Sequence, residues 1–164
     1  MPAYSINNTS FKSLSLMAAV ITGLVATLIM LGGCSDSTKG PSWPLMTDCD
    51  LHQQACLATS PDQTQQVELA LSPQPIPIAR PIEASVQLHG FEDVTKVELD
   101  IAGINMYMGY NRVNLHAQPN NMFAGQTMLA FCTNEVMQWQ VTVLIHHSDG
   151  QASQVPYLLE TRNR

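Results

Sequence analysis

Sulfur-bearing side chains are the groups in this chain best suited to chemistry. From residue 35 onward the sequence holds six methionines and three cysteines. Met106 and Met108 stand two positions apart, so on a strand their thioether sulfurs would lie on one face. Thioether and thiolate sulfurs select Cu(I) over harder ions. If that strand neighbours the one leading to Cys132, then Cys132 or Met137 could complete a three-coordinate Cu(I) site.

A packing role is the alternative explanation for the same side chains. Methionine is flexible and fills irregular gaps in apolar cores. Cys132, which follows Phe131, could likewise be a buried apolar thiol without a function, because cysteines outside disulfides are among the most buried residues. A thiol nucleophile paired with a distant histidine is a third possibility. The sequence alone leaves these alternatives open.

Two other cysteines, Cys49 and Cys56, bracket a short polar segment. A continuous helix would hold them about 10 Å apart, beyond the reach of a disulfide. Neighbouring thiols usually pair in an oxidising compartment, so we predict a loop closed by a Cys49–Cys56 disulfide. The alternative is a metal site formed by both cysteines and His52, although the spacing matches no standard zinc or redox motif. Otherwise, His52 and His116 are expected to be solvated.

An uncharged apolar run precedes the remaining cysteine, Cys34, and Lys12 is the single cation before that run. A short basic region, an apolar stretch and small residues match the pattern of an export signal. The tetrad Leu31-Gly32-Gly33-Cys34 resembles the lipobox of bacterial lipoproteins, whose cysteine is acylated and becomes the first residue of the mature protein. Since roughly 20 apolar residues can span a bilayer, an uncleaved transmembrane anchor is the alternative.

The lipobox resemblance implies that membrane lipid, attached through Cys34, holds the protein in the cell envelope, facing the periplasm. An Asp directly after the cysteine would resemble the inner-membrane retention signal of enteric bacteria. Because Ser35 stands there instead, the outer membrane is favoured. The implied parts are a signal peptide over 1–33, a lipidated cysteine with a flexible tether over 34–47, and a folded domain over 48–164. Within the tether, Trp43 and Met46 could pack back on the edge of the domain.

Apolar and polar residues alternate with period two in several runs from Val67 onward. The clearest runs are 67–71, 84–88, 97–101, 139–145 and 155–159. Turn residues separate them, and Ser148-Asp149-Gly150 is typical of a hairpin. About seven short strands predict an all-β fold, namely an immunoglobulin-like β-sandwich that follows the N-terminal signal or anchor helix. A small barrel is the alternative.

Segment 104–116 departs from this alternation. Its alternating apolar residues stand at even-numbered positions up to Tyr110, whereas Val113 and Leu115 stand at odd-numbered positions. A strand changes its buried parity only through an extra residue, a bend or a change of sheet. A bulge or crossover is therefore predicted at 109–112, and we look for a site there. The candidate contacts for an envelope protein partner are Tyr107, Tyr110 and Arg112.

Three stretches of the chain are similar to small exported β-sandwich proteins of the FixH, YtkA and CopC type. They are Met106-Tyr107-Met108-Gly109-Tyr110-Asn111-Arg112, Gly125-Gln126 and Trp139-Gln140-Val141-Thr142-Val143. The similarity extends over roughly residues 66–161. Some of those proteins are linked to copper handling or cytochrome oxidase assembly, so the resemblance implies an accessory role of this kind. The chain lacks the His-x-Met pair that periplasmic copper chaperones carry.

The charge balance argues against a nucleic-acid partner. The chain has 13 acidic and 7 basic residues, its net charge is −6, and its cations are scattered rather than clustered. No Gly-x-Ser-x-Gly elbow, Walker loop or His-Glu-x-x-His motif occurs. We therefore expect a non-enzymatic, membrane-anchored binding or accessory module in the periplasm, with Cu(I) as its candidate ligand. The alternative is a protein–protein interaction module of the envelope with no metal or small ligand.

Overall fold

The computed structural model describes residues 40–109 and 111–162, and these contain strands but no helix. The predicted signal peptide over 1–33, Cys34 and Tyr110 lie outside the described residues. The predicted all-β class is confirmed, with eight strands where about seven were expected. The strands are β1 (Cys56–Thr59), β2 (Gln66–Ser72), β3 (Pro81–His89), β4 (Val94–Gly103), β5 (Asn111–Gln118), β6 (Met122–Met128), β7 (Val136–His147) and β8 (Ala152–Arg162).

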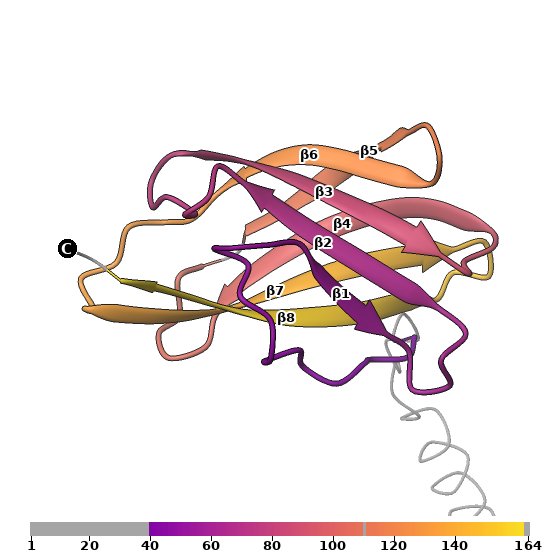
Figure 1. The fold of residues 1–164 in the computed structure, drawn as a ribbon, viewed down its shortest axis with the longest axis horizontal. Coiled ribbons are helices and arrows are strands. Elements are labelled where there is room, and N and C mark those ends of the chain that lie inside the picture. Colours follow the sequence, from indigo (N-terminus) through magenta and orange to yellow (C-terminus); the bar gives the residue numbers. More distant parts are fainter. Residues whose placement is uncertain (1–39, 110, 163–164) are drawn as a thin grey trace, which may run out of the picture. The chain divides into compact units, whose positions relative to one another are not determined.

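The eight strands form one antiparallel sheet that nearly closes on itself (Figure 1), in the order β1-β2-β3-β6-β5-β4-β7-β8. Most neighbouring strands follow one another along the chain, whereas β3–β6 and β4–β7 pair across longer stretches. The β4–β7 register sets Gly103, the last residue of β4, opposite Trp139 near the start of β7. This pairing brings the loop after β4 and the loop before β7 to the same end of the sheet.

The core consists of the apolar residues that alternate along the strands. On β2, for example, Val67, Leu69 and Leu71 are buried, while the residues between them are partly exposed. Each of the five runs predicted from the alternation lies within a strand and turns its apolar residues inward. Burial of apolar surface stabilises the fold by about 25 cal/mol per Å², and this free energy favours the arrangement in which the alternating apolar residues face inward.

Strand β5 changes its neighbour part-way along its length. Its first part, as far as Leu115, pairs with β4, and the part from His116 onward pairs with β6. Gly125 of β6 permits the close crossing, because a Cβ there would lie 2.8 Å from the Leu115 side chain. The bulge or crossover predicted at 109–112 assumed one strand over 104–116, whereas residues 104–109 form a loop before β5, and the change of neighbour at Leu115–His116 is a separate feature.

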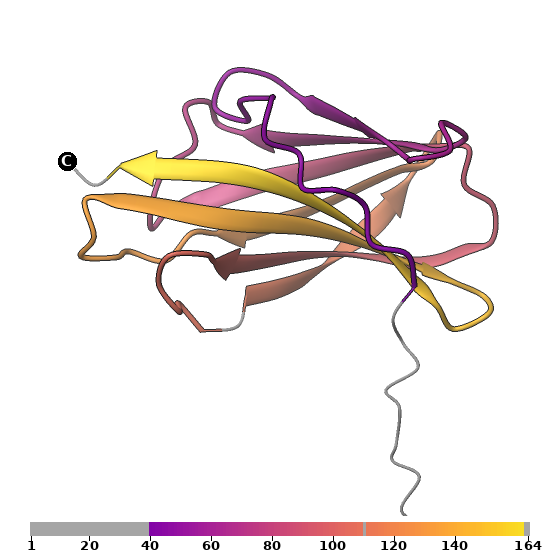
Figure 2. The same ribbon diagram turned by 90° about the horizontal axis from the view of Figure 1, so that it is seen from below.

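Residues 41–46 run parallel to β8 and extend the sheet at that edge (Figure 2). The backbone N–H of Trp43 donates to the carbonyl of Gln154 at 2.9 Å, and Met46 pairs with β8 in the same way. The Trp43 side chain is buried and stacks against Phe91. The flexible tether predicted over 34–47 is thus not observed at 41–46, where backbone hydrogen bonds fix the chain to β8.

Candidate functional site

Two sulfur atoms from different loops meet at one end of the sheet. The Cys132 thiol donates a hydrogen bond to the thioether sulfur of Met106, with 3.2 Å between the two atoms. Cys132 is only 4% exposed, whereas Met106 is 37% exposed. Cys132 keeps its thiol, because the disulfide in the described residues joins two other cysteines. The pair therefore presents two soft donors, one of them reachable from solvent.

Asn105 holds the first of these loops against β7. Its side-chain amide donates to the carbonyl of Val136 at 3.0 Å, and its side-chain oxygen accepts from the backbone N–H of Gln138 at 3.1 Å. The backbone N–H of Ile104 also donates to the Gln138 carbonyl, at 2.8 Å. These three hydrogen bonds place Met106 beside the loop that carries the thiol.

Asn134 links Cys132 to a third sulfur. Its backbone N–H donates to the Cys132 sulfur at 3.4 Å, and its side-chain amide lies 3.9 Å from the sulfur of Met137. Met137 is almost completely buried, at the start of β7. Asn134 is therefore a common neighbour of Cys132 and Met137.

Met108 does not join this cluster in the way the sequence predicted. Residues 104–109 form a loop rather than a strand, so Met106 and Met108 do not lie on one strand face. The chain turns sharply after β4, and any side chain at Gly103 would collide with the backbone carbonyl of Met106. Met108 instead lines a separate hollow of about 520 Å³, together with Met128.

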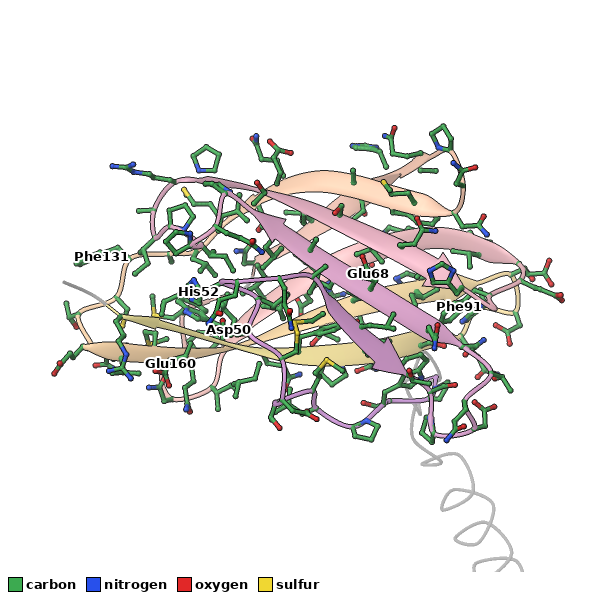
Figure 3. The ribbon with its side chains drawn as sticks, viewed as in Figure 1. Asp50, His52, Glu68, Phe91, Phe131 and Glu160 are labelled. Carbon is green, nitrogen blue, oxygen red and sulfur yellow. A yellow bond between two sulfur atoms is a disulfide. The ribbon has the colours of Figure 1, made fainter. Side chains whose placement is uncertain are left out.

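Two large apolar side chains that follow Met106 and precede Cys132 in the sequence face solvent. Tyr107 is 87% exposed and Phe131 is 67% exposed, and Phe131 lies at the outer end of the sheet (Figure 3). Arg112, predicted near the surface, is exposed and forms an ion pair with Asp100 at 3.3 Å. Tyr107 and Arg112, the two predicted partner contacts that the structure describes, are therefore both exposed, while Tyr110 lies outside the described residues.

The disulfide predicted between Cys49 and Cys56 is confirmed, with 5.8 Å between the two Cα atoms. Because the two sulfurs are bonded to each other, the alternative metal site with His52 does not form. The expectation that His52 is solvated is wrong. Its Nδ1 accepts the backbone N–H of Ile76 at 3.0 Å, and its Nε2 donates to the carbonyl of Glu160 at 2.7 Å. These two hydrogen bonds hold the ring between the connection from β2 to β3 and the end of β8.

A cluster of charged groups lies on β4 and β7. The Glu98 carboxylate contacts the Lys96 ammonium and the His146 ring, each at 2.7 Å. Burial alone would raise the pKa of Glu98, but the hydrogen bonds from Lys96 and His146 outweigh that effect and hold the pKa below 4.5. The neighbouring His147 instead contacts Ser153 at 3.0 Å. The two adjacent histidines therefore serve different partners rather than one site.

Within residues 40–109 and 111–162, no three His, Cys, Asp or Glu side chains converge so that they could hold a metal ion. The same part of the chain also has no helix long and apolar enough to cross a membrane.

Comparison with known proteins adds no functional assignment. No protein-family model matches the chain, and no curated protein matches it in sequence.

Proposed function

We propose that this protein is a non-enzymatic, membrane-anchored accessory protein of the bacterial cell envelope that binds Cu(I) through Met106 and Cys132. The observation that supports the proposal is the 3.2 Å contact between the two sulfur atoms. A thioether and a thiolate are the donors that favour Cu(I) over Mg²⁺ or Ca²⁺. Three hydrogen bonds between the Met106 loop and β7 hold one donor in place before any metal arrives.

Binding of Cu(I) replaces the proton of the Cys132 thiol, because the thiolate is the metal ligand. The proton leaves to solvent, so one proton is released for each ion bound. Met106 provides the approach from solvent, since it is the more exposed member of the pair. Met137 is the proposed third donor, and it binds once the Asn134 amide moves from its sulfur. Met108 is not a ligand in this proposal.

The proposed anchor is diacylglycerol on Cys34, followed by a short tether that ends where residues 41–46 join β8. Two or more acyl chains give stable membrane attachment where one does not. The Cys49–Cys56 disulfide supports an exported location, because disulfides persist outside the reducing cytoplasm. The residue after Cys34 is Ser35, and we accordingly propose the periplasmic face of the outer membrane.

For the fold, we propose the immunoglobulin-like sandwich class. The change of partner within β5, from β4 to β6, supports it, because it divides the strands into two groups. The buried alternating residues on both groups supply the apolar layer between two packed sheets.

Competition between the protein and a coloured Cu(I) chelator tests the proposed ligands. The full chain in neutral detergent should bind one Cu(I), and Met106→Leu or Cys132→Ser should weaken binding by about tenfold or more. Met122→Leu is the matched control, because Met122 is 39% exposed and lies away from both loops, on β6. Unchanged Cu(I) affinity in both ligand variants would refute the proposal.

Protein docking through Tyr107 and Phe131 is a second candidate function. It is favoured by the exposure of both side chains, which lie in the two loops that carry Met106 and Cys132. A photo-crosslinking amino acid at position 107 should give a discrete crosslinked product in living cells. The same group at Leu57, an exposed apolar residue of β1, should give none. Equal products at both positions would count against a specific docking surface.

A further inference from the structure

A groove of about 690 Å³ lies beside the last residues of β8. Its walls come from three parts of the chain: the disulfide loop, with Asp50 and His52, the connection between β2 and β3, with Ile76 and Ile78, and residues 158–162 of β8. Figure 3 shows Asp50, His52 and Glu160 gathered toward the end where β8 finishes. The volume falls in the range of sites that hold ligands or peptide segments.

The backbone of β8 turns N–H groups without a described acceptor toward this groove. Glu160 pairs with Gln138 of β7, but Gln138 directs its own backbone N–H and carbonyl to the β4 side. Val136, opposite Arg162, likewise directs its carbonyl to Asn105. In an antiparallel ladder, the N–H and C=O groups of a residue in such a non-hydrogen-bonded pair point away from the partner strand. The N–H groups of Glu160 and Arg162 therefore point outward, and no described residue accepts from them.

The same edge already accepts an added strand a few residues earlier. The N–H groups of Gln154 and Leu158 donate to the carbonyls of Pro41 and Met46, at 2.9 Å each. Pro156 occupies the outward position between them, where a missing N–H does no harm. The added segment leaves β8 after Met46. The next outward-facing residues of β8, Glu160 and Arg162, line the groove.

His52 provides the strongest sign that the groove edge is competent to pair. Its ring donates to the Glu160 carbonyl, in the place where a neighbouring strand would supply a backbone N–H. The edge beyond Leu158 is therefore only partly covered, by one side chain rather than by a strand. An unpaired edge of this kind is a ready template for an extended chain.

The charge of the groove selects among possible segments. Asp50 and Glu160 supply two carboxylates, against the single guanidinium of Arg162, which pairs with Glu160 at 2.7 Å. The backbone hydrogen bond from His52 and the side-chain bond from Gln53 hold the pKa of Asp50 below its ordinary value, so it is ionised at neutral pH. Ile76 and Ile78 supply apolar side chains to the lining.

We propose that this groove binds an extended segment of a partner protein, which pairs with Glu160–Arg162 as an added strand and alternates apolar with basic side chains. The apolar side chains face Ile76 and Ile78, and a basic side chain approaches Asp50. Backbone pairing provides affinity and the alternating side chains provide selectivity, as in other cases of strand addition. The inference does not depend on Cu(I) binding, because no sulfur of Met106 or Cys132 lines the groove.

The test uses the full chain in neutral detergent and a labelled peptide of about six residues, the usual length of a strand, with alternating valine and lysine. Fluorescence anisotropy should show binding, and the amide NMR signals of Glu160 and Arg162 should shift. N-methylation of one alternate set of peptide amides should abolish binding, while methylation of the other set should not. Only backbone pairing along one edge predicts that difference.

Side-chain selectivity has its own controls. Replacement of lysine by glutamate in the peptide should weaken binding by about tenfold. Asp50→Asn should weaken binding of the lysine peptide several-fold, whereas Asp149→Asn should not. Asp149 is a matched control, because it accepts a backbone N–H two residues on, just as Asp50 does.

Four results would overturn the proposal. They are no binding at about 1 mM peptide, equal binding of both methylated peptides, signal shifts confined to residues outside the groove, and a concentration-dependent dimer that itself occupies the β8 edge.

Discussion

The hydroxyl of Tyr157 on β8 donates a 2.7 Å hydrogen bond to the backbone carbonyl of Val67 on β2. These two strands are not neighbours in the sheet, so the bond crosses the core and ties its two sides together. Burial raises the pKa of Tyr157 above its ordinary value of 10, so the hydroxyl keeps its proton and remains a donor. Sheet closure is thus fixed by a polar contact inside an apolar core.

Removal of that contact should destabilise the fold. Tyr157→Phe leaves the Val67 carbonyl buried without its donor, which should lower the free energy of unfolding by about 1–3 kcal/mol. Urea denaturation followed by far-UV circular dichroism measures the change. Tyr107→Phe is the control, because the exposed Tyr107 should show a change within about 0.5 kcal/mol. Equal stability of both variants would mean that the Tyr157 contact does not secure closure.

Much of the fold could be predicted from the sequence, because its longer strands have one buried and one more exposed face. The alternation of Val67, Leu69 and Leu71 indicates both the strand and its buried side. The strand β1 escaped prediction, since four residues are too few to show a period. The sequence suggests that Trp43 and Met46 pack on the edge of the domain, as they do. It does not predict the backbone pairing of residues 41–46 with β8, because a Pro- and Ser-containing segment is typical of a linker.

The candidate site could be predicted only in part. The sequence brings Met106 and Cys132 together only if their strands are neighbours, whereas loops bring them into contact. Strand periodicity predicts Met108 beside them, and that periodicity does not apply in a loop. No local signal marks His52, because its partners are backbone groups 24 and 108 residues away in the sequence.

The disulfide should contribute to stability by restricting the unfolded chain. Replacement of both Cys49 and Cys56 by serine should cost about 2–3 kcal/mol, as expected for closure of a short loop. Alkylation in denaturant followed by mass measurement reports the pairing. Cys132 should react without reductant, and two further sites should react only after reduction. Reaction of all three without reductant would contradict the Cys49–Cys56 pair.

Acid should weaken the contribution of Glu98 to the free energy of unfolding. Its pKa is lower in the folded protein than the ordinary value of 4.5, so its ion pairs stabilise the fold above that pH. That stability is lost as the pH falls through the lowered value. Glu98→Gln should therefore be less stable than the wild type at pH 7, and the difference should shrink in acid.

Urea midpoints measured from neutral to acidic pH test the Glu98 prediction. Glu92→Gln is the control, because Glu92 is exposed in the turn between β3 and β4 and makes no ion pair among the described residues. A Glu98→Gln deficit that stays constant with pH would show that lost packing, rather than lost charge, causes it.

Cys34 should be the single site of lipid attachment. Cells given radioactive palmitate should label the wild-type protein and the Cys132→Ser variant, and should leave Cys34→Ser unlabelled. The labelled protein should sediment with membranes, because its acyl chains partition into the bilayer. Retention of label in Cys34→Ser, or an unlabelled product in the cytosol, would contradict the proposed anchor.

The central claim is that a thiol and a thioether, held together by two loops, form a site for Cu(I). X-ray absorption at the copper edge of the loaded full chain tests it most directly. The nearest shell around copper should consist of sulfur, should lose one scatterer in Cys132→Ser and should stay intact in Met122→Leu. A nearest shell of nitrogen or oxygen that is unaffected by Cys132→Ser would contradict it.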